Sequence, residues 1–183
     1  MANREAIREL QARLASRLQA ARNEGLSVSW LAVKSGGGNY LFPLAQSGEI
    51  FPIASMQPVP YARPWFRGVV NLRGGLYGVV DVARFVASSG VGAAAPGAPA
   101  AVAAAATEAM VVTLNAALDV NCALMVDALA GLRSPEAFTA AQAPGADAPA
   151  YFGNRFTDAS GEHWQEINLQ TLSQLSGFLT ITA

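Results

Sequence analysis

The stretch that decides the fold reads Pro64-Trp-Phe-Arg-Gly-Val-Val-Asn-Leu-Arg-Gly-Gly-Leu-Tyr-Gly-Val-Val-Asp81. Two extended apolar runs flank a polar centre from Asn71 to Gly75, which is the pattern of a β-hairpin. Glycine in that centre supplies the positive backbone dihedral angles that tight turns require. The stretch therefore predicts two antiparallel strands with a turn between them.

Strand-like segments recur on both sides of this hairpin. They are short, rich in β-branched and aromatic residues, and separated by glycine-containing turns. The segments lie at 28–34, 39–45, 49–56, 110–114, 119–132, 153–158 and 162–168. Turns this frequent predict antiparallel all-β units, because parallel crossovers need long connections. Residues 137–150 are more polar and predict a loop.

Three other segments differ from this pattern. Residues 2–24 place Ile7, Leu10, Leu14, Leu18 and Ala21 at helical steps, so we expect an amphipathic helix that packs on the domain that follows. Residues 87 to about 107 are rich in Ala, Ser, Gly and Pro and read as a linker. Residues 169–178 predict a short terminal helix.

Composition narrows the possible functions. Of 183 residues only 14% are charged, and a chain so poor in charge covers its apolar surface by packing or by a partner. Ten of the twelve basic residues but only five of the thirteen acids precede residue 85. The acidic remainder argues against wholesale nucleic-acid binding. No apolar run of eighteen residues and no secretory signal is seen, so we expect a cytoplasmic protein without membrane insertion.

Few residues in the sequence are candidates for catalytic or metal-binding chemistry. His163 is the single histidine and Cys122 the single cysteine, so neither a metal site nor a Ser-His-Asp arrangement is favoured. Asp81 and Asp127 follow similar strands, where an acid usually accepts hydrogen bonds from turn amides rather than forming a catalytic pair. Cys122 reads as a small buried apolar residue. The sequence therefore favours a protein that is not an enzyme and needs no cofactor.

Aromatic and basic residues alternate just before and within the hairpin: Tyr61, Arg63, Trp65, Phe66, Arg67, Arg73 and Tyr77. Tyr, Trp and Arg dominate protein-interface hot spots, and the same residues build single-stranded nucleic-acid platforms. Because the second half of the chain is acidic, we favour a protein interface and keep a single-stranded nucleic-acid-binding barrel as the alternative.

The element Asn71-Leu-Arg-Gly74, with Gly68-Val69 before it and Asp81 after it, closely resembles CheW-like domains. The similarity extends more weakly over residues 40–53, 110–127 and 153–172. The predicted N-terminal helix and the sequence from Asp158 to Trp164 are similar to the twitching-motility branch of that family, the PilI type.

This resemblance implies an all-β fold of two small five-stranded barrels side by side, with an N-terminal and a short C-terminal helix. We expect the N-terminal helix at 1–25 and the CheW-like domain at 26–183. Within that domain, the first barrel is expected at about 26–86, the linker at about 87–107, and the second barrel with the C-terminal helix at about 108–183. It also implies a non-catalytic adaptor without metal or cofactor. Such an adaptor couples the cytoplasmic tip of a methyl-accepting chemoreceptor to a chemotaxis-type histidine kinase at membrane-associated arrays.

By position, Asn71, Arg73 and Gly74 lie in the family motif associated with receptor contact. Arg63, Trp65 and Arg67 are further candidate contacts with a receptor or kinase. For Arg73 two roles remain open: the guanidinium donates to a carboxylate or carbonyl of a partner, or it staples the hairpin to the neighbouring barrel.

Overall fold

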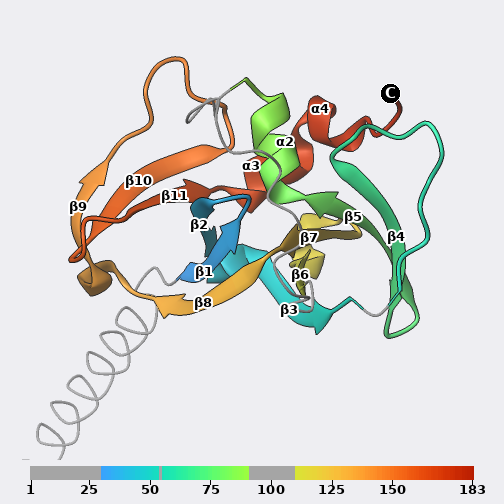
Figure 1. The fold of residues 1–183 in the computed structure, drawn as a ribbon, viewed down its shortest axis with the longest axis horizontal. Helices are drawn as coiled ribbons and strands as arrows, with labels where there is room; N and C mark the ends of the chain where they lie inside the picture. The colour runs from blue at the N-terminus through green and yellow to red at the C-terminus, as the bar shows by residue number, and fades with distance from the viewer. Residues whose placement is uncertain (1–29, 54, 91–109) are drawn as a thin grey trace, which may run out of the picture.

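The computed structural model describes residues 30–53, 55–90 and 110–183. The predicted N-terminal helix and all of the predicted linker except residues 87–90 lie outside these ranges. The described residues form two β-sheets side by side with short helices gathered above their junction (Figure 1). None of the helices in these ranges has the length and apolar character that crossing a membrane requires.

One sheet has six strands and the other has five. In the order in which the strands are hydrogen-bonded, the first consists of β8 (Ala128–Arg133), β1 (Trp30–Ser35), β2 (Gly38–Pro43), β11 (His163–Ile167), β10 (Phe152–Asp158) and β9 (Phe138–Gln142). The second consists of β3 (Ser47–Pro52), β6 (Met110–Leu114), β7 (Cys122–Val126), β5 (Gly75–Asp81) and β4 (Phe66–Leu72). The expectation of two β units is confirmed, but one of them has six strands rather than five.

The strands are not divided between the sheets at the predicted linker. The chain leaves the six-stranded sheet after β2 through the 3-10 turn η1 (Leu44–Gln46), and it returns between β7 and β8 through the single residue Asp127. Asp127 fixes that return, since its backbone N–H donates to the carbonyl of Lys34 and its carboxylate accepts from the N–H of Gly36 at 2.7 Å. Alternation along a strand predicts the strand and its buried face but not its partner. For that reason the division at 87–107 assigned β1, β2, β6 and β7 to the wrong units.

Each sheet also contains one parallel pair, which corrects the expectation of purely antiparallel units. β2 pairs with β11, and β5 pairs with β7. Both connections are long: the first runs through most of the chain, and the second passes through helix α2 (Val82–Ser88) and strand β6. Parallel neighbours need such crossovers, so the pairing is consistent with the topology.

Two elements depart from the sequence expectations. Helix α2 was not predicted: most of it lies before residue 87, and only its end falls in the predicted linker. Strand β9 lies within the predicted loop at 137–150. Asp81 begins α2, because its carboxylate accepts from the N–H of Arg84 at 3.1 Å. The predicted terminal helix is found as two short pieces, α3 (Leu169–Gln174) and α4 (Ser176–Leu179), separated by Leu175 in an extended conformation.

The five-stranded sheet curls until its two ends meet. Gln57, which follows β3 at one end, exchanges two backbone hydrogen bonds of 2.8 Å with Val69 of β4 at the other end. Gly68 permits this approach: its φ is +141°, and a Cβ there would collide with the carbonyl of Gln57. Val70, Val79, Val111 and Ala123 fill the interior. The glycine of the Arg67-Gly68-Val69 element therefore closes the sheet.

The six-stranded sheet curls around its own apolar cluster. The turn η3 (Pro135–Ala137) connects its end strands, β8 and β9, directly. Trp30 lies 5.8 Å from Phe138 edge to face, and Phe156 lies 4.8 Å from Trp30, as measured between ring centroids. Such aromatic pairs add stabilisation beyond the area they bury. Each sheet therefore has an interior of its own.

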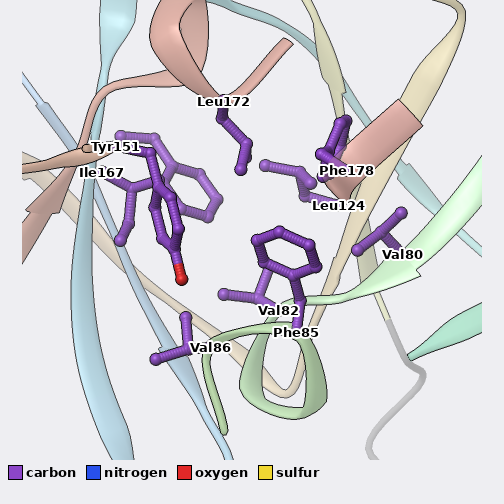
Figure 2. A pocket seen from close by; sticks show the side chains of 10 residues that line it. Val80, Val82, Phe85, Val86, Leu124, Tyr151, Ile167, Leu172 and Phe178 are labelled. Carbon is purple, nitrogen blue, oxygen red and sulfur yellow. The ribbon is translucent and has the colours of Figure 1, made fainter. Parts of the chain in front are cut away.

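The largest apolar cluster lies between the two sheets and beneath the helices. Figure 2 shows the ring of Phe85 entering this core from α2, while the side chains of Leu172 in α3 and Phe178 in α4 enter it from other directions. Tyr151 is also buried there, and its hydroxyl donates to Ser89 Oγ at 2.8 Å. Both sheets contribute side chains to this cluster, so they share one core.

Candidate functional site

The tip of the β4–β5 hairpin is a two-residue turn. Leu72 pairs with Gly75, and the two residues between them, Arg73 and Gly74, have φ values of +49° and +85°. Positive φ at both positions is the requirement of the type I′ turn, whose twist matches that of the flanking strands. Asn71 Oδ1 accepts from the N–H of Gly74 at 3.0 Å and locks the turn. Asn71 and Gly74 thus hold Arg73 at the exposed tip.

Arg73 pairs with Glu49 of β3, a residue that the sequence analysis did not single out. Arg73 Nη1 lies 2.7 Å and 2.9 Å from the two carboxylate oxygens, and the guanidinium lies 5.4 Å from the ring centroid of Phe51. The pair joins the two ends of the five-stranded sheet, since Arg73 follows β4 and Glu49 belongs to β3. Both side chains remain more than half exposed. No sequence signal connects residues 24 apart, because the closure of the sheet alone brings them together.

The Arg73–Glu49 pair borders a shallow depression. Its lining consists of Glu49, Phe51, Leu72, Arg73, Gly75, Tyr77 and Thr113. The hollow offers aromatic walls from Phe51 and Tyr77, with a charged donor and a charged acceptor at its rim. A site of this kind accepts an apolar side chain of a partner protein and hydrogen-bonds the polar groups beside it. We name it the hairpin-tip site.

The remaining candidate contact residues are not part of this site. Arg63 is exposed at the opposite end of the hairpin, where its Nε donates to the carbonyl of Thr180 at 3.2 Å. Arg67 is half-buried, and its Nε has no hydrogen-bond partner among the described residues. Trp65 is 3% exposed and packs against Phe85 and Phe178, so its placement on a binding surface is corrected: it is a core residue.

The burial of Trp65 also divides the proposed aromatic and basic patch. Phe66 and Tyr77 are half-buried, whereas Tyr61 is 92% exposed. A single-stranded nucleic-acid platform stacks successive bases on aromatic faces open to solvent. With Trp65 inside the protein, the patch does not present such a series of faces. The geometry therefore favours the protein-interface alternative.

The titratable groups considered as candidates for chemistry have structural roles. The carboxylates of Asp81 and Asp127 accept from the backbone amides of Arg84 and Gly36, which confirms the expectation that they bind turn amides. Cys122 is buried, and desolvation raises the pKa of its thiol to about 12, so it is an apolar core residue as expected. The exposed His163 lies with Nδ1 3.1 Å from Thr157 Oγ1. In the described ranges no three His, Cys, Asp or Glu side chains are grouped as metal ligands would be.

Comparisons with known proteins agree with the geometry. Protein PilI of Pseudomonas aeruginosa is 30% identical over 74 residues, which are 40% of this chain and 42% of that protein, so the match spans less than half of its length. The crystal structure of the scaffolding protein TtCheW from Thermoanaerobacter tengcongensis has the same fold, with a TM-score of 0.59, 15% identity, and coverage of 83% of this chain and 96% of that one. The family described as CheW-like domain matches residues 29–175, which is most of the chain. The chain therefore belongs to the CheW-like domain family.

Proposed function

We propose that this chain is an adaptor that couples a methyl-accepting chemoreceptor to a chemotaxis-type histidine kinase. Membership of the CheW-like family makes it a non-catalytic scaffold. The observation that carries the proposal is the hairpin-tip site, because Asn71 and Gly74 of the family motif hold an exposed arginine beside an aromatic depression. Exposed arginine next to aromatic side chains is the composition of a protein-binding hot spot.

The similarity to PilI supports a place in the chemosensory system that controls type IV pili and twitching motility. In this proposal the chain works in the cytoplasm and is recruited to membrane-associated receptor arrays. Arg73, Glu49 and the depression contact the helical tip of the receptor, and the kinase binds elsewhere on the same molecule. An adaptor needs two surfaces that do not overlap, since both partners are held at once.

The test is co-sedimentation of the purified chain with the receptor's cytoplasmic fragment and with the kinase. Arg73→Glu removes the contact and breaks the pair with Glu49, so capture by the receptor should fall about tenfold or more. Arg155→Glu is the matched control, because Arg155 is exposed on β10 of the other sheet and forms no ion pair with another described residue. It should leave capture unchanged.

The double variant Glu49→Arg with Arg73→Glu separates the two roles of Arg73. If the arginine only staples the sheet ends together, the reversed pair restores receptor capture. If its guanidinium contacts the receptor, the double variant remains defective. Unchanged capture of both partners by Arg73→Glu contradicts the proposed role of the hairpin-tip site.

A further inference from the structure

A second surface lies at the opposite end of the β4–β5 hairpin, around the loop Gln57-Pro-Val-Pro-Tyr-Ala-Arg-Pro64. Its members are Val59, Tyr61, Arg63, Arg84 and Leu179, and we name it the Tyr61 surface. The side chain of Tyr61 is 92% exposed, and Leu179 and Val59 are exposed by 51% and 37%. Exposed apolar residues are ordinary when single, but a group of them beside arginines is typical of an interface.

The backbone of Tyr61 is strained. Its φ is +58°, in the left-handed region that bulky residues rarely adopt. Strain of this kind persists only where the surrounding structure enforces it, and it is concentrated at functional positions. The side chain of Tyr61 gains little burial in return, since almost all of it faces solvent. Folding alone therefore does not explain a tyrosine at this position.

The C-terminal residues hold the loop in place. The N–H of Ala183 donates to the carbonyl of Tyr61 at 3.0 Å, and the N–H of Arg63 donates to the carbonyl of Ile181 at 2.8 Å. Arg63 Nε adds a bond of 3.2 Å to the carbonyl of Thr180. These bonds place Leu179, which precedes Thr180, beside Arg63. They fix the surface before any partner arrives, which reduces the entropy lost on binding.

The floor under this surface is rigid. Trp65 stacks on Phe178 of α4 with centroids 6.3 Å apart and an interplanar angle of 1°, and it meets Phe85 edge to face at 5.1 Å. The N–H of Phe66 donates to the carbonyl of Arg63 at 2.9 Å and closes a turn over this cluster. Buried Trp65 thus positions the exposed residues on either side of it.

Charge around this turn is positive. Arg84 reaches the carbonyl of Pro64 with Nη1 at 3.4 Å, and Arg63 and Arg67 lie on the two sides of the same turn. Arg84 also pairs with Asp81 at 3.4 Å, whereas no carboxylate among the described residues pairs with Arg63 or Arg67. Three arginines against one acid favour a partner that presents carboxylates, which arginine binds through two parallel hydrogen bonds.

We propose that the Tyr61 surface binds an acidic face of the histidine kinase while the hairpin-tip site holds the receptor. This inference rests on the proposed function. The seven-residue strands β4 and β5 separate the two surfaces by roughly 20 Å, so both partners fit at once. Tyr61 is the apolar anchor of this interface, and Arg63 gives it its charge selectivity.

The test measures binding of the purified full-length kinase, and separately of the receptor fragment, by isothermal titration calorimetry at low and moderate salt. Tyr61→Gly removes the side chain and relieves the positive φ, so its melting temperature should equal or exceed that of the natural chain. Its affinity for the kinase should nevertheless fall about tenfold or more, while receptor affinity stays the same. Arg63→Glu should weaken kinase binding and reduce its dependence on salt, and Arg155→Glu should do neither.

Failures of this inference and of the proposed function are distinguishable. If the natural chain binds neither protein, the proposed function fails. If it binds both and Tyr61→Gly and Arg63→Glu bind the kinase as well as the natural chain does, the Tyr61 surface is not the kinase site. Loss of receptor binding instead of kinase binding, or loss of self-association alone, likewise overturns the assignment.

Discussion

Replacing Gly68 with alanine tests how the five-stranded sheet is closed. A Cβ at this position meets the carbonyl of Gln57 and the Cα of Pro58, so the segment at Gln57 must move away from β4. Separation costs the two 2.8 Å hydrogen bonds between Gln57 and Val69, each worth about 0.5–1.5 kcal/mol net. The φ of +141° adds strain of about 1–3 kcal/mol for a residue other than glycine. We expect the free energy of unfolding to fall by about 2–6 kcal/mol, a large share of the total for a domain of this size.

The assay is equilibrium unfolding in urea, followed by tryptophan fluorescence. Gly161→Ala is the matched control, because Gly161 also has a positive φ, of +84°, but no atom lies within 4 Å of a Cβ built there. Only the backbone cost of the left-handed conformation applies to it, about 1–2 kcal/mol. If Gly68→Ala destabilises the protein no more than Gly161→Ala does, the contact with Gln57 does not close the sheet and the reasoning is refuted.

Three further predictions follow from the core and the turns. The Ser160 hydroxyl and the Trp164 indole lower the pKa of Asp158 to about 2, so the stability that this carboxylate provides is present above pH 4 and is lost as the pH falls toward 2. When the urea midpoint is plotted against pH, Asp158→Asn should therefore flatten the curve between pH 4 and pH 2. An unchanged curve contradicts this prediction. Burial raises the pKa of the Cys122 thiol to about 12, so the native protein should not react with Ellman's reagent at pH 8. In denaturant it should release about one equivalent of the coloured thiolate. Rapid reaction of the native protein would show that the thiol is accessible. Trp65→Ala should cost about 3–5 kcal/mol in the same unfolding assay, since it empties a fully packed aromatic site, and a loss below about 1 kcal/mol would place Trp65 outside the core.

The sequence predicted local structure well where side-chain pattern and turn chemistry coincide. The hairpin at 66–81 and the closing hairpin of β10 and β11 were both expected, because each has strand-like runs around glycine. Helix α2 was missed because alanines and serines made its end resemble the linker. The signal was present in Asp81 as an N-cap with Val82, Phe85 and Val86 at helical spacing.

The candidate site was predicted only in part. Asn71, Arg73 and Gly74 lie together at the hairpin tip, as their adjacency in sequence required. Trp65 and Tyr61 are both aromatic and lie four residues apart, yet Trp65 is buried and Tyr61 is almost fully exposed. A strand alternates its faces, but the irregular loop before β4 has no such period, so exposure there depends on what packs over it. Phe178 and the backbone of residues 180–183 decide it.

By itself, the sequence determined most of the strands, the turn that displays Arg73, the small number of candidate catalytic residues and the family resemblance. Each of these depends on residues close together in the chain. Tertiary structure alone decided which strands share a sheet, how Glu49 reaches Arg73 and why Tyr61 faces solvent above a buried Trp65. Those features depend on contacts between residues distant in sequence. Such contacts form only when the sheets curl and pack, so no local pattern contains them.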